Sequence, residues 1–488
     1  MSGAPDRGSG GTGGGRDLTS GPIGTTLLAF SLPTLASSVL QSLNGSINAV
    51  WIGQFLGERA LAATTNANII MFLLIAAVFG FGMASTILIG QAMGRRDVDQ
   101  VRRVLGSALG LFTIISVLTV CVGWFAAPAI LRALATPAEV YPLALAYLRV
   151  IFIAMPPGFL SVLLTMALRG TGDSLTPLKF MALGSVMDVL LNPLLIRGYG
   201  PFPAMGIEGA AMATLIANVV ALVALLFYIY RRDLTIRLRG AELRYLIPAR
   251  DLLRTIVLKG VPMGLQMLVV SGSALAMIGL VNRNGTSVTA AYGAANQLWT
   301  YVQMPAMSVG AAVSAMAAQN IGAGRWDRVD QVTRAGLMMN LALTGGLVLL
   351  LMLVDRHVLW LFLGNDLGAI GIAARINLIA SWSFVLFGVS MVLTATVRAN
   401  GAVVAPLVIL VIAMFPVRFG IATAFAPRYG SDAIWWSFPA GSLAAMMLTI
   451  GYYRFGGWRR TRVLPAGPEA SEQVKADCEP TAKAMPIG

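Results

Sequence analysis

The sequence predicts an all-α integral membrane protein with twelve transmembrane helices, arranged as two parallel six-helix repeats. Hydrophobic residues make up 57% of the 488 residues and charged residues only 11%, whereas a soluble domain carries about 25% charged residues. Apolar stretches of the roughly 20 residues needed to cross a bilayer recur along the whole chain. Three short sequence blocks also appear in the same order in both halves.

Each half of the chain contains six apolar segments bounded by charged or turn residues. In the first half they lie at 24–53, 62–93, 104–127, 143–167, 174–196 and 207–230. In the second half they lie at 252–281, 288–317, 331–354, 370–397, 403–425 and 433–453. Because each half has an even number of segments, both halves begin on the same side of the membrane and the repeats are parallel.

Individual residues carry the repeat. Pro33 matches Pro262, LRGTGDSLTP matches VRANGAVVAP, and QAMGRRDVDQV matches QNIGAGRWDRVDQV. The second match aligns Arg169 with Arg398, Gly172 with Gly401 and Pro177 with Pro406, and the third begins at Gln91 and Gln319. Such an architecture places a substrate site between the halves, near the middle of the bilayer.

The basic residues predict the orientation. Most of the 35 Lys and Arg residues fall in connections on the side of the N-terminus, which the positive-inside rule assigns to the cytoplasm. This asymmetry accounts for the net charge of +14 without a nucleic-acid partner. We expect a disordered cytoplasmic N-terminus (1–22), an N-terminal lobe (23–230), a cytoplasmic linker (231–251), a C-terminal lobe (252–453) and a disordered cytoplasmic tail (454–488).

Residues for metal, nucleotide or covalent chemistry are scarce. Two cysteines and one histidine cannot supply a disulfide framework or a metal cluster. The sequence contains no GxxxxGK[ST] loop for ATP, and no membrane-depth pair of acids or of nucleophile and base. We therefore expect no enzyme activity, no metal site and no organic cofactor.

Polar residues inside the predicted spans of the first half form stripes. They are Gln41, Asn44 and Asn48 in the first span, Asp188 and Asn192 in the fifth, and Thr214 and Asn218 in the sixth. Spacings of three and four place each set on one helical face. Because buried polar groups are costly in a bilayer, the stripes favour one shared water-accessible cavity, although Thr and Asn also join helices to one another.

Asp188 is the only acid in the middle of a predicted span. A carboxylate at that depth costs about 2.5–3.5 kcal/mol on insertion scales, so Asp188 is a candidate to gain and lose a proton. In the second half, the candidates to line a substrate cavity are Gln266, Asn296, Thr300, Gln303, Asn377 and Ser381. Pro33 is expected to kink the first span and to act as a hinge.

Several segments resemble the multidrug and toxic compound extrusion (MATE) family of secondary exporters, over residues 24–453. They are LPTLASSVLQSLNGSINAVWIGQFLG, GQAMGRRD, ALRGTGDSLTP, LLNPLLI and GIEGAAMAT in the first half, and KGVPMGLQ, AQNIGAG and VRFG in the second. Within this family the chain looks closest to the DinF-like branch, which is associated with proton coupling.

The resemblance implies two facing lobes in a V, and secondary active efflux of drugs or metabolites by cation antiport and alternating access. It implies a monomer in the bacterial plasma membrane and small amphipathic substrates, cationic ones among them. The expected coupling residues are Asp188, Asn192, Asn48, Thr214 and Asn44. The alternative is a flippase for lipid-linked precursors from the same superfamily, a class that often has more spans and a more cationic cavity.

The chain departs from the DinF-like pattern at the expected coupling site. Relatives typically have an Asp in the first span where this chain has Asn48. In the fifth span they have Asn followed by Asp, where this chain has Asp188 followed by Asn192. One carboxylate therefore remains. Because a hard cation such as Na⁺ prefers several anionic oxygens, H⁺ is favoured as the coupling ion, with Na⁺ left open.

Overall fold

The structure is a computed structural model that describes residues 17–134, 136–198, 203–364 and 366–461. Every regular element within these ranges is a helix, as the composition predicts. The disorder expected for 1–16 and 462–488 concerns residues outside the described ranges.

The helices fall into two groups along the chain. The N-terminal bundle consists of α1 (Ile23–Gly94), α2 (Val98–Ala133), α3 (Tyr141–Gly170), α4 (Leu175–Arg197) and α5 (Ile207–Arg231). The linker contains a short 3₁₀ helix, η1 (Gly240–Leu246). The C-terminal bundle consists of α6 (Arg250–Val281), η2 (Asn282–Asn284), α7 (Thr286–Gly322), α8 (Trp326–Leu363), α9 (Leu367–Ala380), α10 (Ser383–Ala399), α11 (Val404–Ile412), η3 (Ala413–Phe419), α12 (Gly420–Ala424), α13 (Ala426–Tyr429) and α14 (Asp432–Phe455), followed by η4 (Gly457–Arg460).

Ten helical segments of the described chain are long and apolar enough to cross a membrane, and α9 with α10 forms one further span bent by 42°. α1 supplies two of the ten, Ile23–Thr64 and Ile70–Gly94. Gly57 interrupts its helical geometry with a φ of 79°, a conformation that glycine adopts readily. α7 is less apolar, but it has 37 residues and lies beside α8 and α10, which makes it the twelfth span. The predicted twelve-helix architecture is confirmed.

Two spans of the C-terminal bundle are less regular than the predicted segments 370–397 and 403–425. The first is divided at Ser381 and Trp382 into α9 and α10. The second contains a π-helical turn, η3, with Pro416 inside it. Proline lacks the backbone N–H that an α-helix needs, and a widened turn accommodates that loss.

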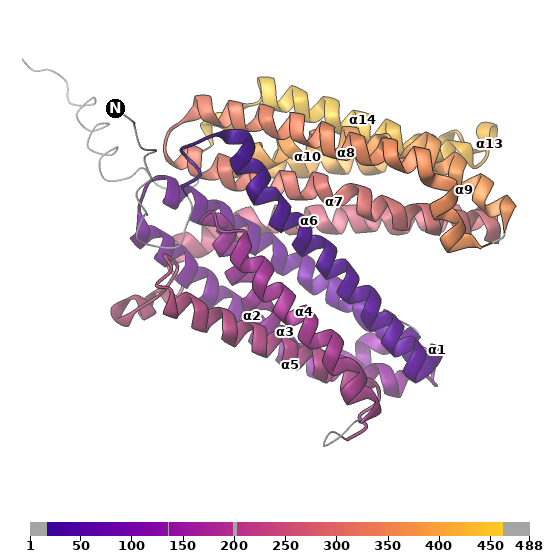
Figure 1. Cartoon of the computed structure of the whole chain (residues 1–488), viewed down its shortest axis with the longest axis horizontal. Helices are drawn as coiled ribbons and strands as arrows, with labels where there is room; N and C mark the ends of the chain where they lie inside the picture. The colour runs from indigo at the N-terminus through magenta and orange to yellow at the C-terminus, as the bar shows by residue number, and fades with distance from the viewer. Residues whose placement is uncertain (1–16, 135, 199–202, 365, 462–488) are drawn as a thin grey trace, which may run out of the picture.

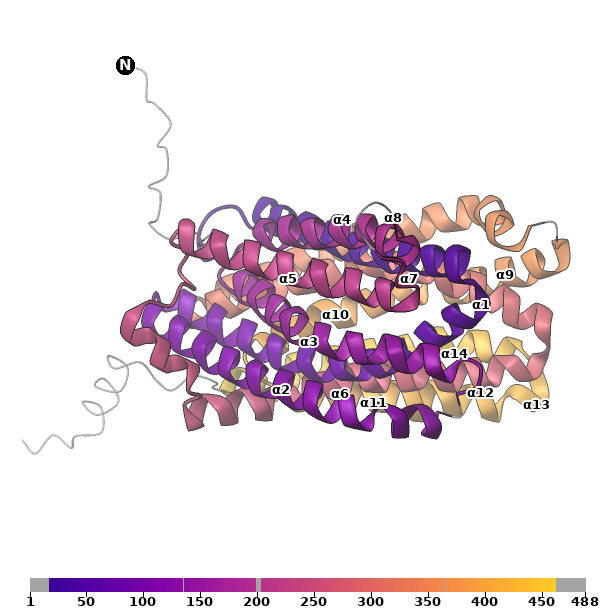
Figure 2. The ribbon, with the colours of Figure 1, turned by 90° about the horizontal axis from the view of Figure 1, so that it is seen from below.

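The two bundles form a V. They lie close together near the start of α1 and diverge toward the opposite end (Figure 1), and the view at right angles shows that most helices run along one common direction (Figure 2). Each bundle has its own apolar core. Phe112 and Leu148 are fully buried in the N-terminal core, and Trp299 and Trp435 are almost fully buried in the C-terminal core.

We call the end near the start of α1 the closed end, because backbones of the two bundles touch there. A Cβ atom on Gly94 would clash with the backbone of Gln319, and one on Gly322 would clash with the backbone of Gln91. Glycine at these two positions is therefore what allows α1 and α7 to approach so closely.

Two side-chain hydrogen bonds cross the same contact. Gln91 Nε2 donates to the carbonyl of Ala399 at 2.7 Å, and Gln319 Nε2 donates to the carbonyl of Gly170 at 3.1 Å. Gly170 and Ala399 occupy equivalent positions in the repeat. The repeat therefore relates the two hydrogen bonds to each other, as expected for halves related by an axis along the membrane normal.

Residues 17–22, the described part of the N-terminal segment, differ from the disorder expected from sequence. Leu18 is fully buried, its N–H donates to Gln319 Oε1 at 3.0 Å, and its carbonyl accepts from Asn320 Nδ2 at 3.2 Å. A single apolar side chain with both backbone groups bonded fixes the segment, which low average hydrophobicity does not predict.

The first residues of the predicted tail, 454–461, are also packed against the bundle. Trp458 is buried and donates its indole N–H to the carbonyl of Tyr453 at 2.8 Å, while Asn400 Nδ2 donates to the Trp458 carbonyl at 2.6 Å. The polar composition of the tail predicts disorder, but this one aromatic residue anchors its first residues to the bundle.

Candidate functional site

The polar stripes of the first, fifth and sixth spans meet around Asp188. Asp188 and Asn192 lie one turn apart on α4, and only 4% and 1% of their surfaces are exposed. α4 packs between α1 and α5. The face that carries both residues is therefore directed at the stripes on those two helices.

The carboxylate of Asp188 accepts four hydrogen bonds. Its Oδ2 accepts from Asn44 Nδ2 at 2.9 Å and from Asn48 Nδ2 at 2.6 Å. Its Oδ1 accepts from Thr214 Oγ1 at 3.1 Å and from Asn192 Nδ2 at 3.3 Å. The five residues assigned to coupling from sequence thus form one hydrogen-bonded cluster that joins three helices.

The asparagines also connect with one another. Asn192 Nδ2 lies 3.1 Å from Asn48 Oδ1 and 2.8 Å from the backbone carbonyl of Asp188. Asn44 Oδ1 and Asn192 Oδ1 are buried and have no hydrogen-bond partner among the residues that the structure describes. An unsatisfied buried acceptor is costly, so each of these oxygens is ready to accept a hydrogen bond from a group that becomes a donor.

All four donors to Asp188 are neutral, and no ion pair of the described chain involves this carboxylate. Donors that are themselves amides or hydroxyls can bond either charge state of a carboxyl group after a rotation, whereas arginine or lysine would hold it ionised. The cluster therefore suits a carboxyl group that changes its protonation state.

Tyr147 of α3 is a further member of the surroundings that the sequence did not single out. It is buried and lies close enough to Asp188 for an electrostatic interaction. The signal in the sequence is one phenolic hydroxyl within the apolar segment 143–167. The sequence alone does not indicate that this hydroxyl lies near Asp188, because that depends on how the helices pack.

The remaining candidates of the first half lie outside the cluster. Gln41 is exposed. Asn218 packs against Gly158 of α3, where an added Cβ would lie 3.3 Å from Asn218 Nδ2. Helix α1 runs through Pro33 with its break at Gly57, so the hinge at Pro33 remains a prediction.

Two second-half candidates are buried inside the C-terminal bundle instead of lining an open surface. Asn377 and Ser381 have no exposed surface, and the indole N–H of Trp299 lies 3.0 Å from Asn377 Oδ1 and 3.2 Å from Ser381 Oγ. Their shared face was identified from spacing, but it is directed at a tryptophan in the core.

The other second-half candidates are distributed over α6 and α7. Asn296 and Thr300 are exposed on α7, and Thr300 Oγ1 bonds to the Asn296 carbonyl. Gln303 Nε2 bonds to the carbonyl of Trp299 at 3.3 Å. Gln266 is buried and bonds to the carbonyl of Val403 at 3.4 Å, away from the α7 group.

Arg418, in the π-helical turn η3, is a charged residue inside a membrane-spanning segment of the C-terminal bundle. Its guanidinium carbon lies 3.6 Å from the ring centre of Phe438, and its Nη1 lies 3.5 Å from Met414 Sδ. Its Nε is buried and has no hydrogen-bond partner within the described part of the chain. Contact with an aromatic face offsets part of the cost of burying this cation.

The fold and this buried polar cluster define a polytopic membrane transporter. The MatE family model matches residues 33–194 and 262–423, which together make up well over half of the chain, so the chain belongs to the MatE family. The two matches begin at the equivalent residues Pro33 and Pro262 and are equally long, as the internal repeat requires. The protein is a transporter of this family and not an enzyme.

Relatives resemble the chain over nearly its whole length. The probable multidrug resistance protein YoeA of Bacillus subtilis is 37% identical over 436 residues, covering 89% of this chain and 94% of YoeA. YpnP of the same organism, also named a probable multidrug resistance protein, is 29% identical over 450 residues, covering 92% and 98%. A solved structure described as an outward-facing multidrug resistance MATE transporter superposes with a TM-score of 0.83 at 21% identity, covering 95% of this chain and 100% of that one, which supports the fold.

Proposed function

We propose that this protein is a secondary active exporter of small amphipathic organic molecules, in a bacterial plasma membrane, driven by H⁺ moving inward. The observation that carries the proposal is the buried Asp188 carboxylate, whose hydrogen-bond donors among the described residues are all neutral. The names of the relatives, probable multidrug resistance proteins, support drug-like substrates. A FAD transporter of Shewanella oneidensis is 28% identical over 315 residues, and its name extends the proposed substrates to metabolites.

The hydrogen-bond cluster provides for both protonation states. The ionised carboxylate accepts from Asn44, Asn48, Asn192 and Thr214. A protonated carboxyl group becomes a donor and needs an acceptor. The unpaired oxygens Asn44 Oδ1 and Asn192 Oδ1 are close by, so rotation of one amide exchanges a donor for an acceptor. Proton binding would thereby rearrange contacts between α1, α4 and α5.

The closed end is proposed to be the cytoplasmic end. The arginine-rich linker between the bundles lies there, and basic connections favour the cytoplasm. On this assignment the bundles diverge toward the outside, and the described conformation is outward-facing. Alternating access then requires the Gln91 and Gln319 hydrogen bonds to break as the bundles close at the other end.

Sodium is the less supported coupling ion. Asp188 brings a single negative charge, and the other nearby oxygens belong to neutral amides and a hydroxyl. A hard cation prefers several anionic oxygens. A proton requires only the one carboxylate.

The test uses the purified full-length protein in proteoliposomes loaded with a fluorescent organic cation, with pH and sodium gradients imposed separately. We expect a pH gradient to drive transport and a sodium gradient alone to fail. Asp188→Asn should insert and bind substrate normally yet lose gradient-driven transport, whereas Glu58→Gln, at an exposed acid, should transport like the parent. Parent-like pH-driven transport by Asp188→Asn would refute the coupling role, and transport driven only by sodium would refute the choice of ion.

A further inference from the structure

The linker between the bundles is folded against α2 at the closed end. Leu234, Ile236 and Leu238 are buried. Helix η1 lies so close to α2 that a Cβ on Gly106 would clash with Tyr245, and one on Gly110 would clash with Leu246. The two glycines therefore form a seat for η1 on the surface of the N-terminal bundle.

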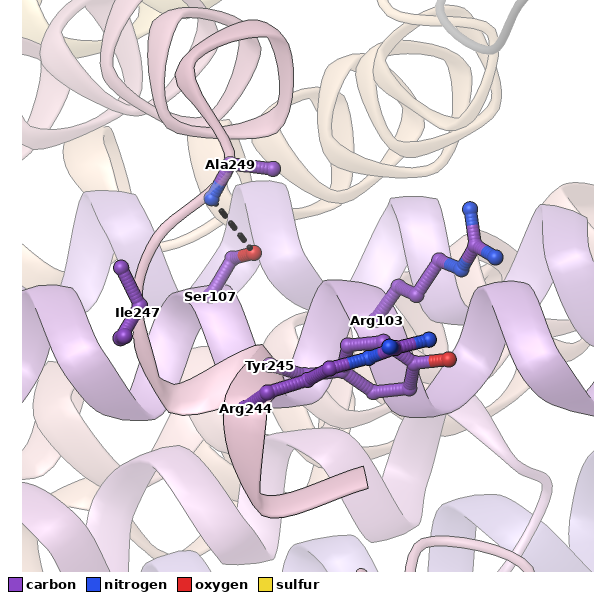
Figure 3. Close-up of a pocket in the computed structure, with 6 residues that line it drawn as sticks. All are labelled: Arg103, Ser107, Arg244, Tyr245, Ile247 and Ala249. Atoms are coloured by element: carbon purple, nitrogen blue, oxygen red, sulfur yellow. Dashed lines mark hydrogen bonds between the residues drawn. The ribbon is translucent and has the colours of Figure 1, made fainter. Parts of the chain in front are cut away.

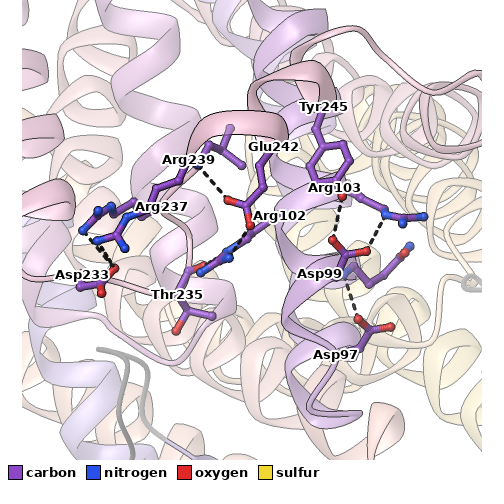
Figure 4. Close-up of polar contacts among 12 residues, drawn as sticks. Asp97, Asp99, Arg102, Arg103, Asp233, Thr235, Arg237, Arg239, Glu242 and Tyr245 are labelled. Atoms are coloured by element: carbon purple, nitrogen blue, oxygen red, sulfur yellow. Dashed lines mark hydrogen bonds and ion pairs between the residues drawn. The ribbon is translucent and has the colours of Figure 1, made fainter.

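Polar contacts hold η1 in this seat (Figure 4). Arg102 of α2 forms an ion pair with Glu242 at 2.5 Å and donates its Nε–H to the carbonyl of Thr235 at 3.2 Å. The hydroxyl of Tyr245 donates to Asp99 Oδ1 at 2.8 Å. Arg102 and Glu242 are each about three-quarters buried, so this pair fixes the position of η1 beside α2.

A cavity of about 250 Å³ lies between α2 and the linker. Its lining residues are Arg103, Ser107, Arg244, Tyr245, Ile247 and Ala249 (Figure 3). The guanidinium carbons of Arg103 and Arg244 lie 5.5 Å and 5.6 Å from the ring centre of Tyr245. One aromatic ring thus orients two arginines at the same cavity.

The charge in this cavity is only partly neutralised. Arg103 is paired with Asp99 at 2.7 Å, but about half of each side chain is exposed. Arg244 forms no ion pair among the described residues, and the nearby Glu242 is already bonded to Arg102. The cavity therefore presents net positive charge to an incoming group.

Apolar side chains lie exposed immediately beside these arginines. Leu243 is 50% exposed, Leu246 40% and Ile247 78%. They lie in the linker just before α6 begins at Arg250, and the end of a spanning helix is where it meets lipid headgroups. Adjacent basic and apolar groups at that level match the headgroup and acyl chains of an anionic lipid.

We propose that this cavity is a binding site for an anionic glycerophospholipid. Arg103 and Arg244 contact the phosphate, because guanidinium groups bind phosphate with two parallel hydrogen bonds. Ser107 and Tyr245 line the headgroup cavity, and Ile247 and Leu246 contact the acyl chains. A lipid bound there joins α2 to the linker, and so to the start of α6 in the other bundle.

The test is native mass spectrometry of the full-length protein in detergent micelles containing dioleoyl phosphatidylglycerol or dioleoyl phosphatidylcholine. We expect bound phosphatidylglycerol on the parent protein and a loss of apparent affinity of about tenfold or more in Arg103→Gln/Arg244→Gln, since each basic group near anionic lipid contributes appreciably. Arg244→Gln alone keeps the ion pair between Arg103 and Asp99 and should show an intermediate loss of affinity. Because that ion pair is intact, this loss reports on lipid binding and not on folding.

The matched control is Arg250→Gln/Arg254→Gln, which removes the same charge from exposed positions near the linker but outside the cavity. Its affinity should stay within about twofold of the parent. Equal losses in both double variants would show diffuse attraction and overturn the site. Equal retention of phosphatidylcholine, or displacement of phosphatidylglycerol by excess inorganic phosphate, would overturn the proposal of an anionic lipid as ligand.

Discussion

Gln91 and Gln319 make the same contact from opposite sides of the molecule, each donating its side-chain amide to a backbone carbonyl of the other bundle. Both glutamines are buried. Gln319 also accepts a hydrogen bond from the N–H of Leu18, so the N-terminal segment is bonded to one of the two glutamines. The closed end is therefore held by directed polar bonds as well as by apolar packing.

Removing one of these bonds should loosen the closed end. Gln91→Ala leaves the buried carbonyl of Ala399 without its partner, at a cost of about 1–3 kcal/mol. A cysteine introduced as Ala318→Cys would be fully buried and would face Gly90 across the contact. In a background without Cys121 and Cys478, this cysteine should react faster with a maleimide when Gln91→Ala is also present.

The control for this measurement is Ala108→Cys, at a fully buried position inside the N-terminal bundle. Its reaction rate should not respond to Gln91→Ala, since Ala108 packs in the core of the N-terminal bundle and takes no part in the contact between α1 and α7. Equal acceleration of both cysteines would mean general destabilisation, and no acceleration at Ala318→Cys would contradict the role given to Gln91.

The glycine contact should be as sensitive as the glutamine contact. Gly94→Ala places a methyl group against the Gln319 backbone, and overpacking of this kind costs about 1–3 kcal/mol. We expect a lower midpoint of thermal unfolding in detergent. Gly279→Ala on α6 has open space around its Cβ and should leave the midpoint unchanged or raise it, because alanine is the better helix former. Similar midpoints for the two variants would argue against a backbone contact at Gly94.

The tryptophan bond inside the C-terminal bundle should contribute to stability. Trp299→Phe removes the N–H that Asn377 and Ser381 share, and should lower the free energy of unfolding by about 1–3 kcal/mol. Ser381→Ala should cost less, because Trp299 keeps its bond to Asn377. Denaturation of both variants and of the double variant tests this: purely additive losses would show that the residues do not interact.

A second carboxylate should be tolerated at Asn48. Asn48 Nδ2 lies 2.6 Å from Asp188 Oδ2, so Asn48→Asp creates two carboxyl groups that share a proton. We expect pH-driven transport to persist with a shifted pH dependence, and to exceed that of Asp188→Asn. Initial rates across a pH series in proteoliposomes measure this. A rate for Asn48→Asp at or below that of Asp188→Asn would be the contrary outcome.

The helical architecture follows from the sequence because lipid allows few alternatives. Spans of sufficient apolar length must be helical, and the repeat of Pro33 at Pro262 orders them in two halves. The cluster around Asp188 could be predicted from the sequence for a related reason. The spacing of Asp188 and Asn192, and of Asn44 and Asn48, reveals one polar face on each helix. A costly polar face in lipid needs a partner face.

Spacing does not tell what a face is directed at. Asn377 and Ser381 share a face just as Asp188 and Asn192 do, yet they bond to Trp299 in a packed core. No proline or glycine lies at the bend after Ser381 to predict it from the sequence. Leu18 and Trp458 anchor segments of otherwise polar composition. In each case the outcome depends on one long-range neighbour, which a local pattern does not contain.

The contact at the closed end is self-complementary, since Gly94 meets the Gln319 backbone as Gly322 meets that of Gln91. A surface of this kind fits a copy of itself, as in a two-fold symmetric homodimer. A chain of half this length could therefore close on a second identical chain through the same residues. When the two copies are joined in one polypeptide, a substitution in one half is not repeated in the other half. The acid at Asp188 and the cation at Arg418 lack counterparts in the opposite halves. An assembly of two identical chains could not contain such differences between its halves.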